Sequence, residues 1–152
     1  MKKLIERILK LGTLVSTFGF LSATLTQIYA RFLMDSAPSW TEEASRFFFV
    51  YAMSFAAGLA MKDDYYVSLD IFYNKLKTKH QQIVDVLISL SIFVLFSIVG
   101  IFALQYVALG IPESSPSLGA PMAIAFTSIV VMSLSICIYA FYSLKTNLKK
   151  TK

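Results

Sequence analysis

The sequence predicts an all-α integral membrane protein with four transmembrane helices. Of its 152 residues, 57% are hydrophobic and only 15% are charged, and the mean hydropathy is +0.66. Soluble domains usually carry about 25% charged residues, so this chain is too apolar for an aqueous surface. It also contains four apolar segments, each near the roughly 20 residues that a helix needs to cross a bilayer. We therefore expect one membrane domain over residues 1–152.

The expected spans cover approximately residues 11–33, 40–61, 83–109 and 121–144. The first has no charge before Arg31. It is longer than the roughly 7–15 apolar residues of a signal peptide and lacks a small-x-small cleavage site, so we interpret it as a retained helix. The second is uncharged between Arg46 and Lys62, and the third is uncharged after Asp85. The fourth begins near Pro121, a residue that suits the first turn of a helix.

Between the second and third spans, the sequence predicts a short amphipathic helix over approximately residues 67–77. Its apolar side chains recur at i, i+3, i+4 and i+7, and Asp70 lies on the opposite face with the lysines. We expect this helix to lie in the membrane interface with its lysines toward anionic headgroups, which makes lipids a partner. Packing against the cytoplasmic face of another protein is the alternative. The apolar residues are Leu69, Phe72, Tyr73 and Leu76.

The positive charges predict the orientation of the chain. Twelve of the 14 basic residues lie in the N-terminal segment, in the connection 62–80 or in the C-terminal tail. The other two connections hold only Arg31 and Arg46, at the adjoining ends of the spans. Because cytoplasmic loops carry the excess of Lys and Arg, both termini are expected in the cytoplasm. The basic residues flank apolar runs and form no continuous patch, so nucleic acid is not an expected partner.

The outer end of the second span has the features of a capped helix. Ser39 and Glu42 have the spacing of a capping box, and Glu42 and Glu43 in the first turn complement the helix dipole. Trp40 lies at the depth expected of an interfacial aromatic anchor.

Charged residues gather at the same outer boundary. Arg46 lies three residues after Glu43 and four after Glu42, so one helical face can pair them. Arg31 approaches this boundary from the first span. A charge near the hydrocarbon edge costs free energy unless it pairs or reaches water. These four residues are expected either to form a network that ties the two helices together or to meet the surface of a partner.

Small residues form packing stripes on the first two spans. Such stripes let helix backbones approach closely in lipid. The sequence leaves open whether they serve the fold of this chain or a neighbouring subunit. The principal positions are Gly12, Ser16, Gly19, Ala23, Ala52 and Ala56, continued by Thr26, Ala30 and Ala60.

The spans lack what a solute pathway or an active site usually needs. Their middles contain no ionisable residue, and no hydrolase, nucleotide-binding or zinc-protease motif occurs. One cysteine and one histidine make no metal cluster, and Cys137 is read as a small apolar residue. A stand-alone homo-oligomeric small-solute transporter normally needs a membrane-embedded acid, and a lipid-modifying enzyme needs clustered His, Asp or Glu. Both remain alternatives with less support.

The stretch from Arg31 to Asp70 resembles the small membrane subunit, DctQ-like or Q, of the tripartite ATP-independent periplasmic (TRAP) transporters. The family pattern has an Arg ending helix one and Trp-x-Glu-Glu-x-x-Arg opening helix two, matched here by Arg31 and by residues 40–46. A small-residue stretch at 56–62 follows, and residues 115–121 resemble the lead into helix four. Tyr66 stands where the family usually has His, and Asp63-Asp64 stand in place of an Arg-Gly type of turn.

The resemblance implies a non-enzymatic scaffold in the bacterial inner membrane. Its expected partners are a large multispan M subunit and a periplasmic substrate-binding P protein that delivers an organic acid, a carboxylate such as sialic acid or a C4-dicarboxylate. Sodium is expected in the M subunit, and no cofactor or substrate site is expected in this chain. The resemblance also implies that Glu42, Glu43 and Arg46 stabilise the outer face near the docking surface, and that Asp70 orders the cytoplasmic turn.

Overall fold

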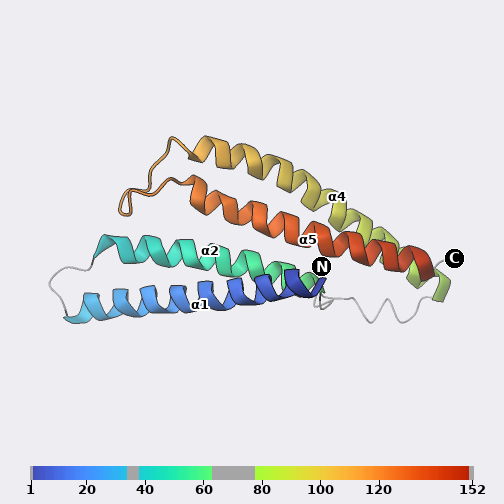
Figure 1. Ribbon diagram of the computed structural model, residues 1–152, viewed down its shortest axis with the longest axis horizontal. Coiled ribbons are helices and arrows are strands. Elements are labelled where there is room, and N and C mark those ends of the chain that lie inside the picture. The colour runs from blue at the N-terminus through green and yellow to red at the C-terminus, as the bar shows by residue number, and fades with distance from the viewer. Residues whose placement is uncertain (1, 34–37, 63–77, 151–152) are drawn as a thin grey trace.

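A computed structural model describes residues 2–33, 38–62 and 78–150 of the chain (Figure 1). These ranges contain four α-helices: α1 (Lys2–Leu33), α2 (Ser39–Lys62), α4 (Thr78–Gly110) and α5 (Ala123–Lys150). All four are long and apolar enough to cross a membrane. The predicted fold class is confirmed.

The helices continue past several of the predicted spans. The helix α1 begins at Lys2 and not near residue 11, and α5 continues to Lys150 beyond the expected end near residue 144. A helix of 32 residues, the length of α1, is about 48 Å long, whereas the hydrocarbon core is about 30 Å thick. The charged turns of such a helix can therefore extend into water while remaining helical.

The predicted interfacial helix over residues 67–77 lies outside the described residues, and so does Asp70. The interpretation of that segment therefore stays a prediction.

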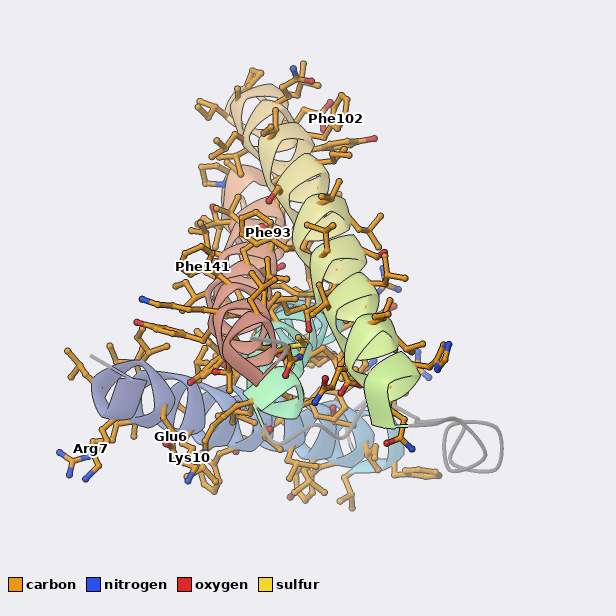
Figure 2. All side chains as sticks on the ribbon, turned by 90° about the vertical axis from the view of Figure 1, so that its right-hand side faces the viewer. Glu6, Arg7, Lys10, Phe93, Phe102 and Phe141 are labelled. Atoms are coloured by element: carbon orange, nitrogen blue, oxygen red, sulfur yellow. The ribbon has the colours of Figure 1, made fainter. Side chains whose placement is uncertain are left out.

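The four helices pack in a row, in the order α1, α2, α5, α4. Within the described ranges, the extensive helix contacts join α1 to α2, α2 to α5, and α5 to α4. Figure 2, which views the molecule along its long axis, shows α1 on one side and the α4–α5 pair on the other. The α4–α5 connection lies at the same end of the molecule as the start of α2, and the C-terminus lies at the opposite end (Figure 1). The row leaves each helix widely exposed.

The packed core lies where α5 meets the end of α2 and the first turns of α1. A cluster of buried side chains there is formed by Leu9, Met61, Ile136, Tyr139 and Ala140. On the surface of the helix row, large apolar side chains are exposed, such as Phe18 at 75% and Phe32 at 85%. A soluble protein would bury side chains of this kind away from water. In a membrane protein the lipid tails cover them, so they can stay on the protein surface.

The start of α1 and the end of α2 are joined by ion pairs. The Oε1 atom of Glu6 lies 2.7 Å from Nζ of Lys10 on the same helix and 3.0 Å from Nζ of Lys62 at the end of α2. Arg7, next to Glu6, points away from the other helices (Figure 2). Glu6 thus links the basic ends of the two helices.

Candidate functional site

The candidate site lies at the start of α2, where the sequence predicts a charge cluster. The helix begins after Pro38, whose carbonyl oxygen accepts both the backbone N–H of Thr41 at 3.2 Å and its hydroxyl at 2.8 Å. Thr41 is fully buried at this point. Trp40 is exposed beside it, as an interfacial anchor would be.

Glu42 and Arg46 form an ion pair on the surface of α2. Nη2 of Arg46 donates to Oε1 of Glu42 at 2.5 Å, one helical turn apart. Glu42 therefore contacts Arg46 and does not close the capping box that its spacing from Ser39 predicts. Since the arginine side chain is 75% exposed and the glutamate 50%, this pair contributes little to stability, about 0.3–0.5 kcal/mol.

Glu43 holds the connection between α4 and α5 (residues 111–122), named here the outer loop after the side of the membrane on which the sequence predicts it. Its Oε2 accepts the backbone N–H of Ser117 at 3.0 Å and that of Leu118 at 2.8 Å. The buried hydroxyl of Ser115 is a further polar group of the same loop. Hydrogen bonds to a carboxylate are shorter and stronger than neutral ones, so Glu43 fixes the loop to α2. Figure 1 shows the loop reaching toward the start of α2.

The four predicted charges do not form one network. Arg46 pairs with Glu42, and Glu43 accepts hydrogen bonds from the loop. Within the described part of the chain, Arg31 forms no ion pair. Arg31 is exposed in the last turn of α1. The predicted pairing of Arg46 with Glu42 is therefore present, whereas the partner of Glu43 was not predicted, and the functional role of these residues stays a prediction. The loop donors lie 74 and 75 positions away, and no local spacing could reveal them.

The packing stripe of α1 serves the fold of this chain. Ser16, Ala23 and Ala30 are buried. A Cβ added to Gly12 would lie 2.8 Å from the ring of Phe55, and one added to Gly19 would lie 2.7 Å from the ring of Phe48. The glycines therefore make room for phenylalanines of α2, which resolves the alternative that the sequence left open for α1.

The alanine stripe of α2 is less covered. Ala52, Ala56 and Ala60 are half-buried. The buried positions of the inner half of α2 are instead Ser54, Gly58 and Met61. The expectation that Ala52 and Ala56 pack against a helix therefore stays open between this chain and a neighbour.

Polar groups that the sequence analysis did not single out join α5 to its neighbours. The hydroxyl of Tyr51 on α2 donates to the carbonyl oxygen of Ile124 at 2.7 Å. Between α4 and α5, the hydroxyls of Ser89 and Ser143 lie 3.2 Å apart, and Nδ2 of Asn147 donates to Ser89 at 3.3 Å. In lipid such contacts hold helices together where apolar burial gives no driving force.

The described residues offer no grouping of His, Cys, Asp or Glu able to hold a metal ion. Cys137 is half-buried in α5, with Sγ 3.6 Å from the hydroxyl of Ser97 and 3.9 Å from the carbonyl oxygen of Phe93. This position, between α5 and α4, fits the prediction of a small packing residue.

Known proteins resemble the chain over most of its length. The family model described as the DctQ component of tripartite ATP-independent periplasmic transporters matches residues 20–150. A Haemophilus influenzae protein described as a TRAP transporter small permease is 22% identical over 149 residues, covering 98% of this chain and 90% of that protein. The sialic acid TRAP transporter small permease protein of Vibrio cholerae is 30% identical over 106 residues, covering 70% of this chain and 60% of that protein.

Proposed function

The chain belongs to the DctQ family of TRAP transporter components, and from this premise we propose that it braces the large transport subunit in the bacterial inner membrane. The observation that carries this proposal is the composition of the spans. They hold packing residues and interhelical hydrogen bonds, but no ionisable residue in their middles. A subunit that moves a charged solute normally places such residues along its pathway. The transport path then belongs to a partner.

The open row of helices supports a lateral partner in the membrane. The accessible surface of the chain is 10654 Å². A compact folded monomer of 17.0 kDa would expose about 7,700 Å². A helix row of this kind has room for both a large subunit and lipid.

The proposed cargo is an organic acid. The Vibrio cholerae relative is named for sialic acid, which carries a carboxylate, and a C4-dicarboxylate is another substrate of this chemical class. In this proposal the large subunit binds the acid and the coupling sodium ions, and this chain binds neither cofactor nor cargo. A periplasmic binding component would deliver the acid and dock on both membrane subunits.

Uptake by whole cells tests the proposed function. Deleting this chain from its host should abolish sodium-dependent uptake of the carboxylate, and supplying the chain in trans should restore it. The purified chain in proteoliposomes should move no carboxylate alone. Unimpaired uptake in the deletion strain would contradict the proposal, and transport by the chain alone would favour the stand-alone transporter.

Cysteine labelling tests the proposed orientation. Ser114 lies in the outer loop and Lys145 lies near the end of α5, at the opposite end of the row. Both side chains are exposed. In intact spheroplasts, a membrane-impermeant maleimide should label Ser114→Cys, whereas Lys145→Cys should react only after lysis. The wild-type chain, whose Cys137 is half-buried within α5, serves as the blank. The reverse labelling order would place both termini outside.

A further inference from the structure

The first turns of α1 carry a stripe of basic side chains that faces away from the other helices. Lys3, Arg7 and Lys10 recur at i, i+4 and i+7, so they share one side of the helix, and all three are exposed. The opposite side of the helix packs into the core through Ile5 and Leu9. Figure 2 shows Arg7 pointing away from the rest of the row.

The acid beside this basic stripe is already engaged. Glu6 is the only acidic residue of α1, and its Oε1 lies 2.7 Å from Nζ of Lys10 and 3.0 Å from Nζ of Lys62. Among the residues that the structure describes, no ion pair involves Lys3 or Arg7. These two charges are therefore available to an anionic partner from outside the described chain.

The charges of α1 also indicate how deep these turns lie in the bilayer. Residues 11–30 are uncharged, and their length matches the roughly 20 residues that cross the hydrocarbon core, so Lys10 and Arg31 mark its two edges. Arg7 then lies about 4.5 Å beyond the edge along the helix axis, whereas the headgroup region is about 5–7.5 Å thick on each side. Arg7 is thus level with the lipid headgroups.

A stripe of exposed apolar side chains runs along α1 beside the basic one. Leu4, Ile8 and Leu11 each follow a basic residue by one position, and each is more than half exposed. One position is a rotation of about 100° on an α-helix, so the two stripes are neighbours on its surface. The apolar stripe therefore leads from the level of Arg7 into the hydrocarbon core.

We propose that this side of α1 binds one anionic phospholipid molecule, with its phosphate on Arg7 and an acyl chain along the apolar stripe. A guanidinium binds phosphate oxygens in a bidentate manner. Lys3, one turn farther from the core, attracts a headgroup of net negative charge and repels the ammonium of a zwitterionic one. A soluble anion would leave the apolar stripe uncovered, whereas a lipid covers both stripes. The inference does not depend on the proposed function.

The test measures which phospholipid contacts the apolar stripe of the full chain in vesicles. Trp40 is the only tryptophan of the chain, so Trp40→Phe combined with Leu11→Trp places a single fluorescent reporter at the site. Bromine atoms on an acyl chain quench the fluorescence of a tryptophan that they contact. The vesicles mix phosphatidylglycerol with phosphatidylcholine, and either lipid is brominated in turn. The two quenching curves give the affinity of the site for the anionic lipid relative to the zwitterionic one.

The reporter chain should prefer phosphatidylglycerol by at least about fivefold, and Arg7→Gln should lower this preference about fivefold, the contribution of one basic residue near a membrane surface. Glu6→Gln should raise the preference, because it releases Lys10 and Lys62 from their ion pairs. Lys145→Gln is the matched control. It removes one exposed charge from α5, toward the same end of the row, and should leave the preference unchanged (Figure 1).

Equal quenching by the two brominated lipids would overturn the inference. A preference that Arg7→Gln leaves unchanged, or that Lys145→Gln lowers equally, would also overturn it, because the effect would then be one of surface charge in general. Purification of the tagged chain from native membranes adds an independent check. Arg7→Gln should retain its protein companions and lose bound anionic phospholipid, and loss of a protein companion would instead make this side of α1 a protein contact.

Discussion

Replacing Gly58 with alanine is expected to destabilise the purified subunit by about 1–3 kcal/mol, the usual cost of overpacking a well-packed contact. Gly58 lies where α2 meets both α5 and α1. A Cβ added there would lie 2.5 Å from Oγ and 2.7 Å from Cβ of Ser135, and 3.1 Å from Cδ1 of Leu9. The Cβ of Ser135 cannot move without its backbone, so α2 and α5 must separate. Thermal unfolding in detergent measures the loss.

A size exchange across this contact provides the control. Ser135→Gly removes the side-chain atoms that clash. The hydrogen bond lost with them is the one that the Ser135 hydroxyl donates to the carbonyl oxygen of Met132 in the same helix. The double variant Gly58→Ala with Ser135→Gly should therefore recover most of the stability that Gly58→Ala loses. Equal instability of the single and double variants would show that the contact between these residues does not determine the spacing of α2 and α5.

Replacing Gly12 and Gly19 together with leucine should displace α1 from α2. Each leucine would collide with a phenylalanine ring of α2, Phe55 or Phe48. Overpacking costs about 1–3 kcal/mol at each position. Within the described ranges α1 has its extensive contact with α2 alone, so the contact of Leu9 with α5 would do little to retain it. We expect little of this variant to accumulate in membranes, as measured by immunoblotting.

Ser22→Leu is the matched control for this variant, because Ser22 lies on the same helix but is exposed. A leucine there adds apolar surface toward lipid and should leave the protein level unchanged. Wild-type accumulation of the Gly12→Leu, Gly19→Leu variant would mean that α1 does not depend on its small-residue stripe.

The sequence was sufficient to predict the four helices, because apolar runs of membrane-spanning length have few other interpretations. The helices continue past the predicted spans at their charged ends. The segment before Leu11 contains good helix formers such as Lys3 and Glu6, and it stays helical although it is too polar for the hydrocarbon core. Hydropathy predicts which part of a helix lies in the hydrocarbon core, but it does not predict the residue at which the helix ends.

The candidate site was predictable only where its contacts are local. The pair of Glu42 and Arg46 follows from a spacing of four residues on a helix. The contact of Glu43 with Ser117 and Leu118 depends on how α2 lies beside the α4–α5 pair, which no periodicity encodes. Gly119, whose φ of +65° suits a turn, is a local feature of the loop that the sequence does contain.

The packing stripes show the same division. Small residues at intervals of three and four predicted close approach by some helix, and the structure assigns the α1 stripe to α2 through the rings at Gly12 and Gly19. The sequence does not predict that Ser135 on α5 is the neighbour of Gly58 on α2. Both residues are small, and small residues identify a contact without identifying its partner.

The most direct test of the central claim, that this chain braces a larger transport subunit, is a purification from native membranes. The tagged chain would be extracted in a gentle detergent, and its companions identified and quantified by mass spectrometry. We expect a large multispan permease to accompany the chain in stoichiometric amount. Recovery of the chain by itself, as a stable homo-oligomer, would contradict the account.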